Sequence, residues 1–246
     1  MITNTFLFNI RKSLIPILIL ASSGLANAQE QSNMGAGNLK YIDPLIGNVG
    51  HLLQPTRPTV QLPNQMIRMF PQRKDYMDDQ ISSFPLNVVS HRLGQVFALK
   101  PSTQNLEAAS WKKRMTYDYD LEVNRPWFYS TNLIEDEVKV AFTPGKKTGY
   151  YKFQFPVKGS KALLLENYNQ GLNEFNFISA TEITGVEIYH GNIKVFMYGV
   201  FSDGATVGTI QDNKLSTNRK VTGKDARAWI RFPENTTGSV EFKYAI

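Results

Sequence analysis

YIDPLIGNVGHLLQPTRPTVQLPNQMIRMFP, residues 41–71, is the stretch of this chain that decides the fold. It opens on an apolar segment around Pro44, breaks at a loop bounded by Gly47 and Gly50, and runs through further prolines into a second apolar segment. Glycine lets the backbone turn sharply, whereas proline fixes φ and keeps a loop from becoming helical. We therefore expect a rigid, polar loop between two strands, which is a suitable place to hold a ligand.

The rest of the chain reads as a series of short strands. Residues 116–123 alternate polar and apolar side chains, the period of a half-buried strand. Residues 138–142 and 150–155 form a predicted hairpin around the Pro144-Gly145 loop. Further strands are expected at 127–133, 162–165, 175–179, 182–188, 193–201, 206–211, 227–232 and 239–246. Many short strands with turn signals and no amphipathic helix predict an all-β, antiparallel β-sandwich or barrel.

The first 28 residues have the pattern of a secretory signal peptide. Arg11 and Lys12 form a basic flank, an apolar run extends to Leu20, and Ala26-Asn27-Ala28 provides small residues at a cleavage site. The apolar run is shorter than the roughly 20 residues of a spanning helix. We expect cleavage after Ala28, no membrane span in the mature chain, and an exported protein that is periplasmic or extracellular.

Composition narrows the function classes. The chain has 246 residues, a formal net charge of +6 and no cysteine. An exported chain with a modest positive charge is a poor candidate for nucleic-acid binding, and the absence of cysteine excludes disulfide bonds and zinc–thiolate sites. The three histidines, His51, His91 and His190, are widely separated, so no transition-metal site is expected.

Three groups of acidic residues are candidates for chemistry, because glycoside hydrolysis generally needs a pair of carboxyl groups. On the predicted strand 116–123, the acidic side chains would share one solvated face, with the tyrosines on the other. The run 135–137 reads as an exposed turn, and Asp78-Asp79 is kept as a possible ligand contact. The groups are Asp75, Asp78 and Asp79; Asp118, Asp120 and Glu122; and Glu135, Asp136 and Glu137.

The three tryptophans could form a platform for stacking a sugar, but large aromatic residues more often belong to the core. Trp127 and Trp229 lie within strand patterns and are expected to be core residues. Trp111 adjoins Lys112-Lys113-Arg114 and is expected at the surface.

The quoted stretch also resembles the opening of the N-terminal domain of glycoside hydrolase family 92, a family of exo-acting α-mannosidases. Residues 43–47 match the family's first strand, and Gly50-His51 match its glycine- and histidine-bearing loop. Residues 56–66 stand where the family's P-G-A to M-V-Q-L stretch lies, with Arg57 in place of a small residue, which implies a reshaped pocket. Residues 90–94 resemble the family's F-S-H-T-H-L-S-G segment.

This resemblance implies a fold and a site. The fold is a supersandwich of the galactose-mutarotase type, and the loop side chains that would bind substrate are Gly47, Asn48, His51, His91 and Arg92. The resemblance puts the acid, the base and the calcium ligands of the family in a separate helical barrel, to which nothing here corresponds. It therefore implies no catalytic residue, no metal and no cofactor within this chain, and a fragment inactive alone although it belongs to a glycosidase family.

The predicted organisation is a signal peptide at 1–28, a flexible lead-in at 29–40 and the β-sandwich at 41–246. The sequence stops inside a strand pattern, so we expect a fragment or truncated reading frame, although a natural chain can also end in a paired strand. Its expected function is glycan binding, with mannose-containing partners, and packing against a catalytic (α/α) barrel. The alternatives are a free-standing carbohydrate-binding module and a structural or adhesive surface protein.

Overall fold

The computed structural model describes residues 37–44, 46, 59–74, 78–89, 94–211, 213–236 and 238–246. The predicted signal peptide at 1–28 lies outside them. The chain divides into two units, residues 1–43 and residues 44–246. In the first unit, residues 37–39 form one helical turn. Among the described residues, no helix is both long enough and apolar enough to cross a membrane.

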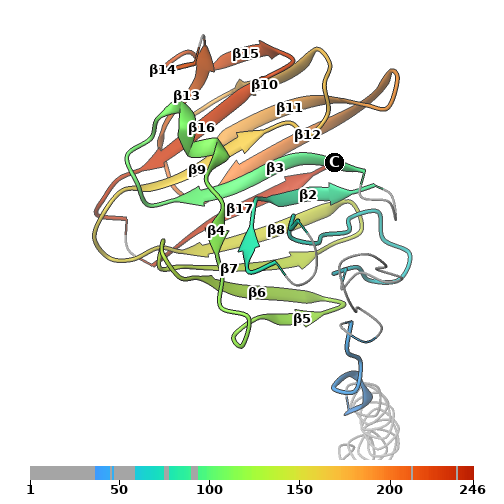
Figure 1. Ribbon diagram of the computed structural model, residues 1–246. Helices are drawn as coiled ribbons and strands as arrows, with labels where there is room; N and C mark the ends of the chain where they lie inside the picture. Colours follow the sequence, from blue (N-terminus) through green and yellow to red (C-terminus); the bar gives the residue numbers. More distant parts are fainter. Residues whose placement is uncertain are drawn as a thin grey trace, which may run out of the picture. The chain divides into compact units, whose positions relative to one another are not determined.

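The second unit is built from antiparallel sheets (Figure 1). Within the described residues, the larger sheet has nine strands. In spatial order they are β15 (Lys220–Gly223), β10 (Asn173–Phe177), β11 (Glu182–Tyr189), β12 (Ile193–Phe201), β17 (Ser239–Ala245), β8 (Thr148–Gln154), β7 (Val138–Pro144), β6 (Phe128–Leu133) and β5 (Val123–Arg125). The last strand in sequence, β17, therefore lies near the middle of the sheet, between β12 and β8.

The second sheet has six strands among the described residues. Their spatial order is β14 (Lys214–Ser216), β13 (Thr206–Gln211), β16 (Arg227–Phe232), β9 (Lys161–Glu166), β3 (Gln95–Ser102) and β2 (Phe84–Val88). A small ribbon of β1 (Gln80–Ile81) and β4 (Met115–Thr116) accompanies it. Pro85 lies in β2, at the edge of this sheet, where proline is tolerated better than in a central strand.

The main core lies between the two sheets, because alternate residues of each strand point inward. On β17, Val240, Phe242 and Tyr244 are buried while the residues between them are more exposed. Phe242 stacks on Phe201 of β12 at 4.5 Å between ring centroids. Gly199 makes room for this ring, since a Cβ at that position would collide with Phe242. These observations confirm the predicted all-β sandwich.

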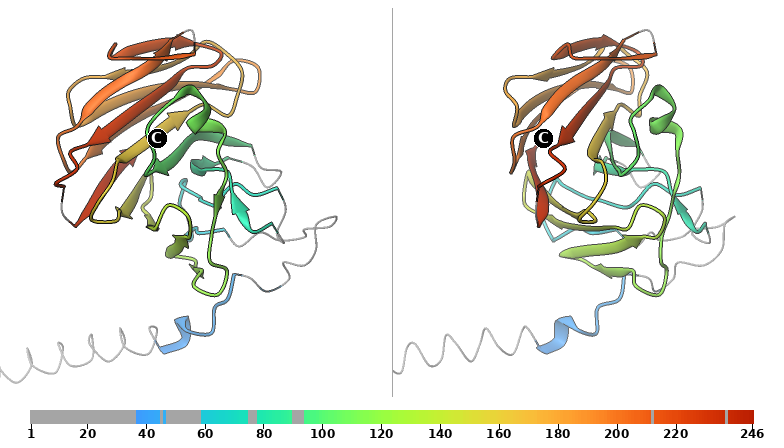
Figure 2. Two further views of the ribbon diagram at one scale, coloured as in Figure 1. Left: turned by 60° about the vertical axis from the view of Figure 1, so that its left-hand side comes forward. Right: turned by 90° about the vertical axis from the view of Figure 1, so that its left-hand side faces the viewer.

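A second, smaller core covers the outer face of the six-stranded sheet. The connection from β3 to β4 crosses that face and carries the short 3₁₀ helix η1 (Ala108–Lys112) (Figures 1 and 2). β9 is buried on both faces for this reason: Leu163 and Leu165 point to the main core, and Leu164 to the second. The second core comprises Leu106, Trp111, Ala162, Leu164, Ile210 and Trp229.

Two expected strands are absent. The first is the apolar segment around Pro44, residues 42–46, whose described residues 42–44 and 46 form turn and irregular structure. In the second, 116–123, only the two end residues are in strands, Thr116 in β4 and Val123 in β5, and the chain turns between them at 119–121. The turn arises because the Asp118 carboxylate accepts hydrogen bonds from the backbone N–H groups of Asp120 at 3.0 Å and Leu121 at 3.3 Å. An aspartate that bonds its own backbone in this way favours a turn over a strand.

Candidate functional site

The five loop residues predicted to contact sugar are Gly47, Asn48, His51, His91 and Arg92, and all of them lie outside the described residues. They stay predictions. The ends of the second loop are held together, because the N–H of Val89 donates to the carbonyl of Gly94 at 2.6 Å. Val89 and Gly94, the described residues on either side of His91 and Arg92, therefore lie next to each other at the end of the β2–β3 hairpin.

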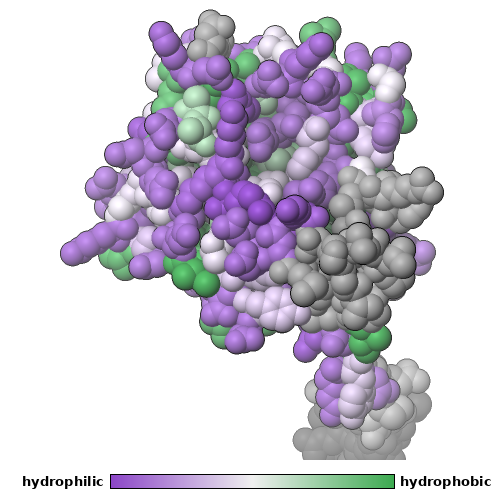
Figure 3. Space-filling view, in the orientation of Figure 1, coloured by the Kyte–Doolittle hydropathy of each residue, from purple (hydrophilic) through white to green (hydrophobic). Residues whose placement is uncertain are grey.

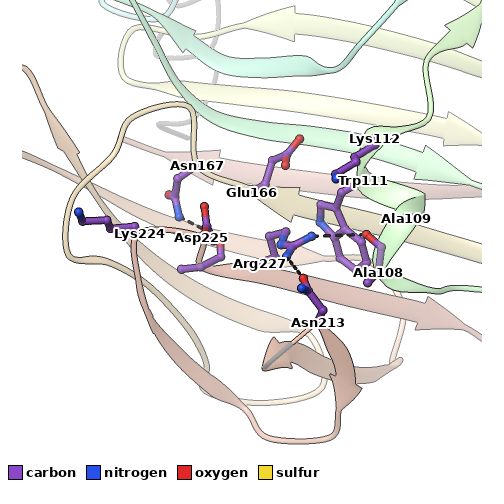
Figure 4. A pocket seen from close by; sticks show the side chains of 11 residues that line it. Ala108, Ala109, Trp111, Lys112, Glu166, Asn167, Asn213, Lys224, Asp225 and Arg227 are labelled. Atoms are coloured by element: carbon purple, nitrogen blue, oxygen red, sulfur yellow. Dashed lines mark hydrogen bonds between the residues drawn. The ribbon is translucent and has the colours of Figure 1, made fainter.

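The described residues contain a hollow of about 500 Å³ on the outer face of the six-stranded sheet. It lies where the end of β9, helix η1 and the start of β16 meet, on a largely hydrophilic face of the molecule (Figures 3 and 4). Its lining mixes polar and apolar surface and carries both signs of charge. The residues are Ala108, Ala109, Trp111, Lys112, Glu166, Asn167, Asn213, Lys224, Asp225, Ala226 and Arg227.

Glu166 is the partly buried acid of this hollow. It is the last residue of β9 and stands directly opposite Arg227 of β16 in the antiparallel register. Burial raises the pKa of the Glu166 carboxyl, and the nearby charges of Lys100 and Arg227 counteract part of that effect. Its side chain points toward the side of the hollow where Lys112 and Trp111 lie (Figure 4).

Arg227 is fixed in the middle of the hollow. Its Nη1 donates to the carbonyl of Ala108 at 3.4 Å, and its Nη2 donates to the Asn213 side chain at 3.1 Å (Figure 4). Its guanidinium carbon also lies 5.8 Å from the centre of the Trp111 ring, within cation–π range. These contacts pre-orient a fork of donors before any ligand arrives.

The opposite end of the hollow is formed by the turn before β16. Asn167 donates from its amide nitrogen to the carbonyl of Ala226 at 3.1 Å, which ties the end of β9 to this turn. Lys224 and Asp225 are exposed at the rim. The hollow thus offers carboxylates, amides, a guanidinium and ammonium groups to one occupant.

Sequence reasoning missed Glu166, Asp225 and Arg227. Glu166 follows the predicted strand 162–165, Arg227 begins the predicted strand 227–232, and Asp225 precedes it. A charged residue at the edge of an apolar run was the available signal. What the sequence did not reveal is that β9 and β16 are neighbours in a register that places Glu166 against Arg227. Strands so far apart in the chain leave no mark of their pairing in a single sequence.

Trp111 is not a surface residue, contrary to the sequence-based expectation. It is 3% exposed, and its indole N–H donates to the carbonyl of Leu165 at 3.0 Å. Trp127 was predicted to be a core residue, but it is only half-buried and lies in the β5–β6 turn. Trp229 is a core residue as predicted, although it belongs to the second core.

The acidic trio of residues 118–122 does not form a solvated strand face. Glu122 is buried and forms an ion pair with Arg73, whose guanidinium lies 4.3 Å from the centre of the Tyr117 ring. Tyr129 donates its hydroxyl to the same Glu122 carboxylate at 2.7 Å. This cluster ties the 69–74 segment to the turn before β5, and we assign it a structural role.

Asp78 and Asp136 are also engaged, whereas Asp75 lies outside the described residues. Asp78 pairs with Arg114 and accepts the backbone N–H groups of Lys74 at 2.7 Å and Gln80 at 3.1 Å. The pKa of Asp78 is lowered because these hydrogen bonds outweigh the opposing effect of burial, which is the largest single contribution. In the predicted turn 135–137, Asp136 is buried against Thr103 and Lys113.

Glu187 is a further buried acid, which lies inside the sandwich. It is fully buried and accepts hydrogen bonds from the N–H groups of Phe97, Tyr168 and Asn169 at 2.6–2.8 Å, and from the Asn169 side chain at 2.6 Å. Burial raises the pKa of Glu187, and these bonds oppose the rise. No ligand can reach it, so it fixes the β9–β10 connection onto β3 and β11. Among the described residues, no three His, Asp or Glu side chains gather as a metal site requires.

Solved structures share this architecture. The inverting mannosidase BT2199 of family GH92 from Bacteroides thetaiotaomicron VPI-5482 superposes with a TM-score of 0.74 at 17% identity, over 84% of this chain and 31% of that one. The family GH92 α-mannosidase BT3965 from Bacteroides thetaiotaomicron gives 0.74 at 20% identity, over 84% and 33%. The family GH92 hydrolase ccman5 gives 0.70 at 18%, over 84% and 32%.

This chain therefore spans about a third of the length of each of these structures. No curated protein sequence matches it. The family model described as the glycosyl hydrolase family 92 N-terminal domain matches residues 41–246, which include the whole of both sheets. The chain belongs to the family of glycosyl hydrolase family 92 N-terminal domains.

Proposed function

We propose that this chain is the N-terminal β-sandwich of an exported α-mannosidase-like glycoside hydrolase. In that role it contributes to binding of mannose-containing glycans and packs against a catalytic (α/α) barrel. The observation that carries the proposal is the family match over residues 41–246, joined to the fact that the chain spans about a third of mannosidases with the same fold. Export, to the periplasm or the exterior, rests on the signal-like residues 1–28.

The chemistry of the reaction indicates which role belongs to the sandwich and which to the barrel. Glycoside hydrolysis needs an acid and a base on either side of the scissile bond. We assign both of them, and the calcium implied by the resemblance, to the barrel. The loops that carry His51, His91 and Arg92 would lend hydrogen bonds to the sugar, because imidazole and guanidinium groups suit vicinal hydroxyls.

The first test is an activity assay. Purified residues 29–246 are expected to release no mannose from an aryl α-mannoside above a buffer blank, because the catalytic pair is elsewhere. Two carboxyl groups do line the hollow, those of Glu166 and Asp225. Turnover that disappears in both Glu166→Gln and Asp225→Asn would contradict the proposal and make the hollow an active site.

The second test is the DNA that follows codon 246. A frame that encodes a helical barrel, in continuity or directly adjacent, supports the proposal. An unrelated gene after a clean stop would instead favour the free-standing binding module. The polar hollow is the observation that keeps this second function open, because such a site needs no barrel to bind a sugar.

A further inference from the structure

We propose that the hollow beside η1 is a second carbohydrate site, which takes one neutral sugar ring and whose lining includes none of the five loop residues predicted to contact sugar. This inference rests on the proposed function in one respect, the assumption that glycans are available to the protein as ligands. The site would hold a glycan without acting on it, as an additional contact on the outer face of the six-stranded sheet.

The shape of the hollow suits a small ligand. Its volume of about 500 Å³ falls within the ~300–1,000 Å³ usual for ligand pockets. Three separate segments converge on it: the end of β9, helix η1 and the turn before β16. Sites at such convergences are held by the scaffold rather than by one mobile loop.

Two acceptors of the hollow receive no hydrogen bond from the described residues, the buried Oδ1 of Asn167 and the Glu166 carboxyl. Among the described residues, none donates a hydrogen bond to the Glu166 carboxyl, although that carboxyl is largely withdrawn from water and its pKa is raised by burial. An unpaired, partly buried acceptor costs free energy until a donor reaches it. A sugar hydroxyl can supply that donor whether the carboxyl is protonated or ionised.

The charges of the lining favour a neutral ligand over an ion. Glu166 and Asp225 would repel an anion, whereas Arg227, Lys112 and Lys224 would repel a cation. A polyhydroxylated ring uses both signs at once, because each hydroxyl donates to a carboxylate or accepts from a guanidinium, amide or ammonium group. The alternation of donors and acceptors around Arg227 therefore matches a sugar better than a phosphate or a metal ion.

Binding must depend on hydrogen bonds rather than on stacking. Trp111 lines the hollow but is only 3% exposed, so it cannot offer an open ring face. A site of this kind is specific for hydroxyl positions and weak for a single sugar, and a longer glycan would gain from contacts elsewhere on the chain.

The test is a nuclear magnetic resonance titration of the ¹⁵N-labelled chain with D-mannose, D-glucose and N-acetylglucosamine. At least one of these sugars is expected to give saturable shifts of the Trp111 indole and Asn167 amide signals. Asp225→Asn and Glu166→Gln should each weaken the association about tenfold, because each removes a charged acceptor. Asp225 is exposed, so its variant will fold. Asp120→Asn, at an exposed turn, is the matched control and should leave binding unchanged.

The outcomes separate this inference from the proposed function. No saturable shift with any of the three sugars overturns the second site, and equal affinity in the wild type and both hollow variants does the same. If His51→Ala loses sugar binding while Glu166→Gln and Asp225→Asn keep it, the sugar binds at the loops, and the second site is also overturned. Saturable shifts of the Trp111 and Asn167 signals with sodium sulfate would show that the hollow binds an anion, and would overturn the inference that its ligand is neutral. In all of these cases, the mannosidase assay and the downstream frame still decide the proposed function.

Discussion

Single hydroxyl groups hold the two sheets in register. Tyr151 and Tyr244 of the nine-stranded sheet reach across the main core and donate to the carbonyls of Pro85 at 2.8 Å and Leu86 at 2.5 Å. Burial raises the pKa of both tyrosines well above the ordinary value, so they remain donors at any physiological pH. Their acceptors lie on β2, an edge strand whose only neighbour within its sheet, among the described strands, is β3.

Tyr244→Phe should therefore lower the free energy of unfolding by about 1–2 kcal/mol, because the Leu86 carbonyl loses its buried donor. Urea denaturation at neutral pH measures the change. Tyr41→Phe, at a position that is 72% exposed, serves as the control and should have no effect. Equal midpoints for all three proteins would show that the hydroxyl contributes nothing to the register.

Lys100 makes stability depend on pH in the alkaline range. Its Nζ donates to the carbonyls of Trp111 and Lys113, both at 2.6 Å, and burial lowers its pKa from 10.5 to about 8. Glu166 and Asp136 oppose that change, while Lys113 and Arg114 add to it. Between pH 8 and 10.5 the unfolded chain thus binds more protons at this residue than the folded chain, so stability rises with pH over this window.

Lys100→Met removes the titrating group. The stability of the wild type relative to this variant should increase by up to about 3 kcal/mol from pH 8 to 10.5, measured as paired urea curves across the range. A difference that stays constant over this window would mean that Lys100 keeps an ordinary pKa in the folded state.

At the scale of elements, η1 functions as a cover for the outer face of the six-stranded sheet. Trp111→Ala should cost about 3–5 kcal/mol, because it leaves a cavity in the second core and removes the bond to Leu165. Trp127→Ala, in the half-buried β5–β6 turn, should cost about 1 kcal/mol or less. Thermal or urea unfolding distinguishes the two, and equal losses would mean that η1 does not secure the sheet.

The sequence predicted most of the strands where they occur. β7, β8, β11, β12, β16 and β17 all lie where strands were expected. It failed at 116–123, where Asp118 bonds its own backbone and a local turn overrides the pattern. It also failed at Trp111, because the charged residues that follow it concealed a side chain buried by a distant sheet. The hollow depends on the β9–β16 register, which arises only when the strands assemble.

At the scale of the whole molecule, the outer face of the nine-stranded sheet carries exposed apolar residues around a further hollow. Leu172 is 80% exposed and Phe196 is 62% exposed, and both line that hollow with Val186 and Ile188. Contiguous exposed apolar surface of this kind promotes association.

Phe196→Thr keeps a good strand former on β12 and removes the largest ring from this face. Sedimentation velocity at increasing concentration should show less self-association in this variant than in the wild type. Lys243→Thr, on β17 of the same sheet, is the control for a surface change that leaves the apolar group intact. Monomeric wild type throughout the range would contradict the expectation.

The place of β17 also orders events during synthesis. The ribosome must release residues 239–245 before the ribbon of β10–β12 can be joined to that of β5–β8, since only β17 bridges them among the described strands. Until then, β12 and β8 each have an unpaired edge where β17 will later bind. The nascent chain is most in need of chaperone protection in that interval.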